Sequence, residues 1–148
     1  MPDVMRIVRA RLGRRMRAFS PSVRRDLQAY LRSARQQQSS RIAVGGRAND
    51  LAYWLLLPSW LASKRTVANR LVRKVVPDIL WGQYALYLAI RIKDDLLDKQ
   101  ARSRNLSVAA RQFMAESQMV FQEYFDKGSD FWPRFQRLID TTNAAIEQ

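Results

Sequence analysis

Apolar side chains recur every three or four residues along most of the chain, and this spacing predicts α-helices. The first predicted helix spans residues 3–19, where apolar positions at helical spacing alternate with six arginines. A second begins after Ser20-Pro21, because a serine followed by a proline is typical of a helix N-terminus, and it ends in the polar run 36–40. No alternating apolar–polar pattern typical of a strand appears, so the sequence predicts an all-α helical bundle.

Prolines and small polar residues set the limits of the later helices. Pro58 is expected to kink or end an apolar central helix, and Pro77 to end a short helix that Thr66 caps. Ser107 is expected to cap the helix after the polar connector 99–107. The remaining helices are predicted over residues 51–57, 67–76, 79–98, 108–125 and 131–146.

Composition narrows the chemistry. The chain has 148 residues, of which 47% are hydrophobic and 26% charged, as in an ordered globular domain. It has no Cys and no His, which excludes thiol nucleophiles, imidazole bases and thiolate or imidazole metal sites. Any metal must therefore be held by oxygen. No apolar run reaches the roughly 20 residues of a membrane-spanning helix. We expect a cytoplasmic protein, with peripheral contact to a membrane as a further expectation.

Charge is unevenly distributed along the chain. Residues 1–74 hold 17 Lys and Arg against 3 Asp and Glu, whereas residues 75–148 hold 9 against 10. A basic half of this kind attracts nucleic acid, anionic lipid or phosphorylated substrates. We expect residues 1–47 to form basic N-terminal helices and a linker, and residues 48–148 to form the first half of a helical domain.

Three aspartates follow an apolar run in the order Asp94-Asp95-x-x-Asp98. On a helix these positions are three or four residues apart, so the three carboxylates crowd one patch. Their repulsion and the negative end of the helix dipole both disfavour the arrangement, and a bound cation relieves both. Because carboxylate oxygens suit Mg²⁺, the pattern predicts a magnesium site. The alternative is a solvated acidic turn neutralised by Lys93 and Lys99.

The stretch Tyr-Leu-Ala-Ile-Arg-Ile-Lys-Asp-Asp-Leu-Leu-Asp, residues 87–98, resembles the first aspartate-rich motif of class I isoprenoid synthases, the all-α prenyltransferases and terpene synthases. The resemblance covers residues 48–148. It implies Mg²⁺-dependent binding and ionisation of a prenyl diphosphate, with Asp94 and Asp98 as metal ligands and Asp95 in support. It also implies that basic residues contact the diphosphate, and the candidates are Arg91, Arg102, Arg104 and Arg47.

The helix geometry independently suggests a pocket for the isoprenoid tail. About two to three turns before the aspartates lie Leu88, Tyr87 and Tyr84, an apolar and aromatic set whose ring faces could stabilise an allylic cation. Ordinary helix packing is the alternative for each of them. Class I synthases also carry a second metal-binding motif on a later helix, and no such pattern follows Asp98. We therefore expect an incomplete isoprenoid-synthase fold, an N-terminal fragment that is inactive alone. The alternatives are half-sites that meet in an oligomer and a chain that has lost its activity.

A different class of function fits the basic half. Residues 1–47 could form a non-catalytic helical module that binds nucleic acid or an anionic membrane surface. The sequence offers no helix-turn-helix, zinc or aromatic single-strand signature, so nucleic acid is the less favoured partner.

Overall fold

The structure, a computed structural model, describes residues 4–43 and 70–147. Within these ranges every regular element is a helix, which confirms the all-α prediction. The helices are α1 (Val4–Ala18), α2 (Pro21–Ala43), α4 (Arg70–Leu97), α5 (Arg104–Gln122) and α6 (Phe131–Ile146). None of them is long and apolar enough to cross a membrane. Arg47 and the helix predicted over residues 51–57 lie outside the described ranges.

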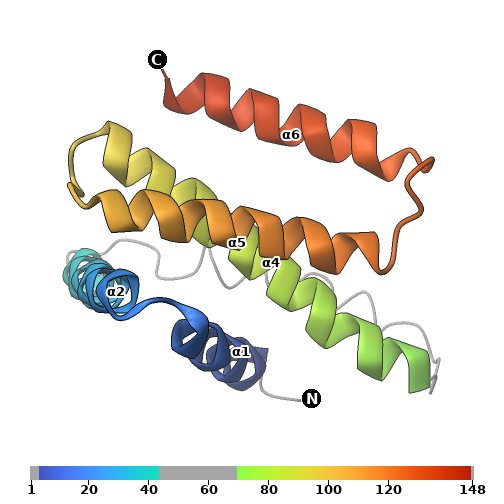
Figure 1. The fold of residues 1–148 in the computed structure, drawn as a ribbon, viewed down its shortest axis with the longest axis horizontal. Helices are drawn as coiled ribbons and strands as arrows, with labels where there is room; N and C mark the ends of the chain where they lie inside the picture. Colours follow the sequence, from blue (N-terminus) through green and yellow to red (C-terminus); the bar gives the residue numbers. More distant parts are fainter. Residues whose placement is uncertain (1–3, 44–69, 148) are drawn as a thin grey trace.

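Helices α4 and α5 form the central pair of the bundle, with α1 packed on α4 and α2 on α5 (Figure 1). The two central helices approach closely at Gly82, which is buried. A Cβ atom there would lie 3.1 Å from a side-chain methyl of Val120 and 3.2 Å from the ring of Phe121. In Figure 1, α6 and α1 lie on opposite sides of this pair.

The predicted apolar stripes form the core. The stripe of α1 and its exit, Val8, Leu12, Met16 and Phe19, is buried as expected. Leu12, Met16 and Phe19 join one cluster with apolar residues of α2, α4 and α5, in which Phe113 is fully buried and meets the Phe19 ring edge-on at 5.6 Å.

A second set of rings joins α5 to α6 through the turn between them. Phe121, at the end of α5, meets the rings of Phe131 and Phe135 edge-on at 5.4 and 5.5 Å. Phe125 stacks on Phe131 with ring centroids 3.9 Å apart. Edge-on and stacked rings of this kind add to the apolar area that they bury, so this aromatic cluster fixes α6 against the central pair.

The predicted helix boundaries are wrong at three places. Pro77 lies inside α4 and does not end a helix, so one helix covers the segment where two were predicted. A proline inside a helix costs roughly 3 kcal/mol, and burial of Leu80, Trp81 and the following core residues outweighs that cost. Helix α2 continues through the polar run 36–40, which contains neither Gly nor Pro and includes glutamines, good helix formers.

The start of α5 is the third difference. Its N-cap is Ser103 and not Ser107, and Ser103 has the extended backbone of an N-cap, with φ −95° and ψ 125°. The Ser103 hydroxyl accepts a hydrogen bond from the backbone N–H of Asn105 at 3.1 Å. The connector after the aspartates is therefore shorter than predicted, and α5 begins close to the motif.

Candidate functional site

The aspartate motif lies at the C-terminal end of α4. Asp94 and Asp95 are in its last turn, and Asp98 follows the last helical residue but still donates its backbone N–H to the Asp94 carbonyl at 2.9 Å. Lys99 then takes the left-handed backbone conformation, with φ 57°. The Ala101 N–H closes the end of the helix by bonding the Asp95 carbonyl at 2.9 Å. The motif is thus held on a fixed helix end.

Asp95 is buried, with 6% of its surface exposed. Its Oδ2 accepts a hydrogen bond of 2.6 Å from the hydroxyl of Tyr30 on α2, and its Oδ1 lies 2.9 Å from Nη2 of Arg91. A buried carboxylate needs such partners, because an unpaired charge in the interior is strongly disfavoured. Burial, together with this hydrogen bond, raises the pKa of Tyr30 above its usual range. Asp95 is therefore fixed between α2 and α4 by Tyr30 and Arg91.

Asp94 and Asp98 keep access to solvent. The Asp94 side chain is 34% exposed and has a long contact of 3.5 Å with Nη1 of Arg91. Asp98 is exposed and accepts a hydrogen bond of 3.3 Å from the side-chain amide of Gln100. The three carboxylates of the motif accordingly divide into one buried, paired group and two accessible ones.

These two accessible carboxylates fit Mg²⁺ by their chemistry. Among the described residues no three acidic side chains come close enough together to hold one ion. Magnesium, however, usually keeps several waters and binds through one or two carboxylates together with substrate phosphates. Asp94, in the last turn of α4, and Asp98, just after the helix, are four residues apart, the spacing of one helical turn, and are candidates for such a pair.

The predicted diphosphate contacts fall into two groups. Arg91 lies inside the motif and pairs with Asp94 and Asp95. Arg102 and Arg104 are exposed, one in the connector after the motif and the other at the first position of α5. Both arginines therefore follow the motif closely in sequence and reach solvent.

The predicted isoprenoid pocket residues lie on α4, about two to three turns before the aspartates. Leu88 is 3% exposed and belongs to the core. Tyr84 is half-buried and stacks on Tyr87, with ring centroids 6.3 Å apart and planes at 30°. Tyr87 is 37% exposed, and burial of part of its ring raises the pKa of its hydroxyl. The two tyrosines, and not Leu88, offer surface beside the motif.

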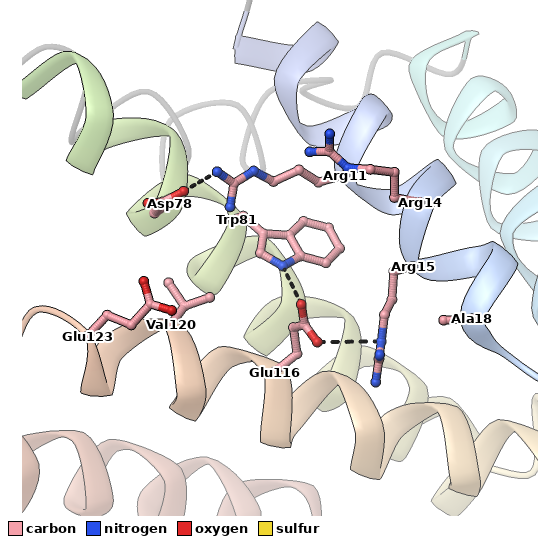
Figure 2. Close-up of a pocket in the computed structure, with 9 residues that line it drawn as sticks. All are labelled: Arg11, Arg14, Arg15, Ala18, Asp78, Trp81, Glu116, Val120 and Glu123. Atoms are coloured by element: carbon pink, nitrogen blue, oxygen red, sulfur yellow. Dashed lines mark hydrogen bonds and ion pairs between the residues drawn. The ribbon is translucent and has the colours of Figure 1, made fainter.

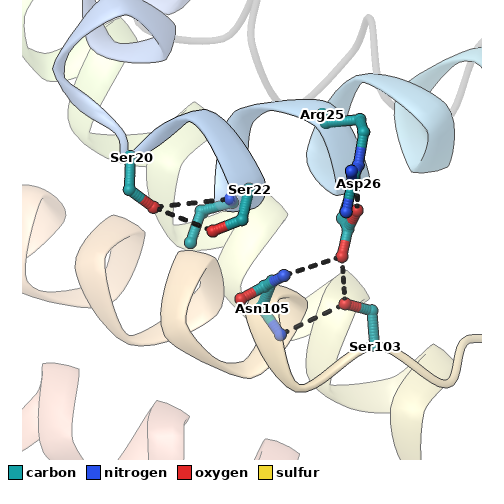
Figure 3. A network of polar contacts seen from close by, with 7 residues as sticks. Ser20, Ser22, Arg25, Asp26, Ser103 and Asn105 are labelled. Carbon is teal, nitrogen blue, oxygen red and sulfur yellow. Dashed lines mark hydrogen bonds and ion pairs between the residues drawn. The ribbon is translucent and has the colours of Figure 1, made fainter.

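A polar network fixes the start of α5 next to the motif (Figure 3). Asp26 of α2 accepts hydrogen bonds from the Ser103 hydroxyl at 2.6 Å and from the Asn105 amide at 2.8 Å. These two hydrogen bonds hold the pKa of Asp26 below its usual value. Helix α2 thus contacts the motif through Tyr30 and the following helix through Asp26, and it positions the two relative to each other.

Tyr30 is the site residue that sequence reasoning missed. Its side chain packs against the core cluster from α2. The signal that could have identified it is its hydroxyl, because a buried tyrosine usually finds a hydrogen-bond partner. Which acceptor it would find depends on the packing of α2, 65 residues away from Asp95 in the sequence.

A cleft of about 390 Å³ lies between α1, α4 and α5 (Figure 2). Arg15 reaches Glu116 at 3.5 Å and Gln112 at 3.4 Å, and the Trp81 indole N–H donates to Glu116 at 3.1 Å. Arg11 pairs with Asp78 in the same cleft. Opposite charges thus face each other across the cleft, and these contacts hold α1 against the central pair.

Asp78 also links α4 to the far end of α5. It accepts a hydrogen bond from the hydroxyl of Tyr124, which follows α5, as well as its ion pair with Arg11. The hydrogen bond to this carboxylate raises the pKa of Tyr124 to about 12.

No family model, curated protein or solved structure matches this chain.

Proposed function

We propose that this chain binds Mg²⁺ and a prenyl diphosphate at the end of α4, as part of a class I isoprenoid biosynthesis enzyme. The observation that carries the proposal is that the three aspartates of the motif have different environments. Asp95 is buried and held by Tyr30 and Arg91, whereas Asp94 and Asp98 stay accessible on one edge of the helix. The motif thus has two carboxylates ready for a ligand and a third that fixes their helix in place.

Electrostatics favours a cation at this position. Two accessible carboxylates one turn apart repel each other, and both face the negative end of the α4 dipole. The single long contact from Arg91 to Asp94 offsets only part of this repulsion. Bound Mg²⁺ supplies positive charge that offsets the repulsion between the carboxylates. As a Lewis acid it also stabilises negative charge on diphosphate oxygens.

The exposed edge of α4 supports binding of an apolar tail. Tyr87, Asp94 and Asp98 fall on the same edge at the helical repeat, with Tyr87 about 10 Å before Asp94 along the axis. A tail extending from a diphosphate at the aspartates toward the start of α4 would cover the stacked rings of Tyr87 and Tyr84. Aromatic faces of this kind suit an isoprenoid chain and the positive charge that develops on ionisation.

Arginines around the motif support the diphosphate end. Arg102 and Arg104 are exposed in the segment that follows the aspartates, and guanidinium groups bind phosphate oxygens in a planar, two-pronged geometry. Arg91 contributes less directly, since Nη2 is committed to Asp95 and only Nη1, at 3.5 Å from Asp94, can turn to a diphosphate oxygen.

Calorimetric titration with farnesyl diphosphate tests the proposal. We expect binding to wild type with Mg²⁺ and little binding when EDTA removes it. In the double variant Asp94→Asn/Asp98→Asn we expect the affinity to fall by roughly 100-fold, since charged metal ligands are lost while the buried carboxylate and the helix remain.

The chain offers a matched control for this variant. Asp126 and Asp130 are both exposed and are also four residues apart, so Asp126→Asn/Asp130→Asn removes the same charge from the turn before α6. The control should bind as wild type does. Equal affinity of all three proteins, or binding that does not depend on Mg²⁺, would exclude Asp94 and Asp98 as the metal ligands.

A further inference from the structure

Helix α1 is basic on every side except the one that enters the core. It carries six arginines and no acidic residue. Arg11 and Arg15 turn inward and pair with Asp78 and Glu116 of the central helices. The other four, Arg6, Arg9, Arg14 and Arg17, are exposed. Arg14 is exposed and also lines the cleft between α1, α4 and α5 (Figure 2).

Three of these exposed arginines, Arg9, Arg14 and Arg17, form what we call the α1 basic face. They spread over roughly 140° of the helix circumference and about 12 Å of its length. Ala10 is exposed on the same side, and a Cβ atom at Gly13 would meet no atom within 4 Å. The α1 basic face is therefore positively charged and open to solvent.

We propose that the α1 basic face docks this protein on an anionic lipid bilayer. Charge complementarity with lipid phosphate and carboxylate headgroups provides the attraction. The helix is attracted to the bilayer surface and does not insert into it. An inserting amphipathic helix buries its apolar stripe in lipid, but in α1 this stripe, Val8, Leu12 and Met16, is already buried against the bundle. This inference does not depend on the proposed magnesium site.

Three features favour a bilayer over nucleic acid. Helix α1 is a side wall of the bundle, packed on α4 through its buried apolar stripe (Figure 1), so it cannot enter a groove as a recognition helix does. Its outer face has no aromatic ring to stack on bases. Separated positive charges without such rings instead suit the headgroup surface of a bilayer.

Vesicle co-sedimentation with the full chain tests this docking. We expect wild type to bind phosphatidylcholine vesicles that contain 30% phosphatidylserine, and not pure phosphatidylcholine vesicles. Each arginine near an anionic bilayer strengthens binding roughly fivefold, so Arg9→Gln/Arg14→Gln/Arg17→Gln should weaken partitioning by roughly 100-fold. Binding of wild type should also fall steeply between low salt and 0.5 M salt, because salt screens exposed charges.

Two variants separate the position of the arginines from total charge and from loss of fold. Arg111→Gln/Arg134→Gln/Arg137→Gln removes the same charge from exposed positions on α5 and α6 and should bind as wild type does. Arg9→Lys/Arg14→Lys/Arg17→Lys keeps the charge of the α1 basic face and should also bind. Circular dichroism of each variant reports whether the helices are retained.

Three outcomes would overturn the proposal. The first is binding of wild type that does not depend on phosphatidylserine. The second is equal loss of binding in the two glutamine variants. The third is a clear preference of wild type for a 20-base-pair DNA over anionic vesicles at equal phosphate concentration, together with loss of DNA binding in Arg9→Gln/Arg14→Gln/Arg17→Gln, which would assign the face to nucleic acid.

Discussion

Replacing Tyr30 by phenylalanine removes one hydroxyl and leaves the rest of the site intact. That hydroxyl donates a 2.6 Å hydrogen bond to Asp95, a residue that is only 6% exposed. In the variant, Asp95 keeps Arg91 as its ion-pair partner. A hydrogen bond to a charged group contributes about 1.5–3 kcal/mol, and its loss here leaves a buried oxygen without its donor. We expect Tyr30→Phe to lower the free energy of unfolding by about 2 kcal/mol.

Urea denaturation followed by circular dichroism measures this change. With a denaturant dependence of roughly 2 kcal/mol per molar urea for a chain of this size, the midpoint should fall by about 1 M. Tyr87→Phe deletes the same atom from the partly exposed tyrosine beside the motif and should change the stability by less than about 0.5 kcal/mol.

A double-mutant cycle assigns the effect to the contact with Asp95. In an Asp95→Ala background, Tyr30→Phe should cost little, because the acceptor is already gone. A Tyr30→Phe midpoint equal to that of wild type, or the same loss in both backgrounds, would refute the assignment of Tyr30 as the residue that holds Asp95.

Further predictions concern the packing, the helix end and pH. Gly82→Leu should lower the urea midpoint markedly, because even a Cβ at this position lies 3.2 Å from the Phe121 ring and a larger side chain must separate α4 from α5. Lys99→Gly should raise the stability by about 1 kcal/mol, since Lys99 holds a left-handed conformation that glycine adopts without a steric penalty. Stability should fall as pH rises above 10, because the folded-state pKa values of Tyr30 and Tyr124 are raised, the latter to about 12, and unfolded tyrosines release their protons first. Urea midpoints at pH 9 and 11 measure this loss, and Tyr30→Phe/Tyr124→Phe should show a smaller one.

Much of the fold could be predicted from the spacing of apolar residues. The stripe Val8, Leu12 and Met16 identified the buried side of α1, and the absence of strand patterns identified an all-α chain. Rules based on single residues, such as a proline that ends a helix, predicted helix boundaries less well where tertiary packing opposes them. A proline normally ends a helix, but Pro77 lies inside α4. The apolar residues that follow it are buried, and this burial keeps α4 continuous.

The candidate site could be predicted only in part. The helical positions of Asp94, Asp95 and Asp98 follow from their spacing, and the structure places them at the end of α4. Their different environments do not follow from spacing, because they depend on where α2 packs. Tyr30 comes from another helix and binds the carboxylate that is buried, Asp95. The choice of Ser103 over Ser107 as the N-cap likewise depends on Asp26 of α2.

The central claim, a divalent cation on Asp94 and Asp98, is tested most directly by paramagnetic broadening in nuclear magnetic resonance spectra. Mn²⁺ accepts the same oxygen ligands as Mg²⁺ and broadens signals of nearby nuclei. In the presence of farnesyl diphosphate, substoichiometric Mn²⁺ should broaden the backbone amide signals of residues 94–99 first, and Asp94→Asn/Asp98→Asn should abolish this broadening. Equal broadening around the exposed pair Asp126 and Asp130, or broadening of residues 94–99 that survives in the double variant, would contradict the account.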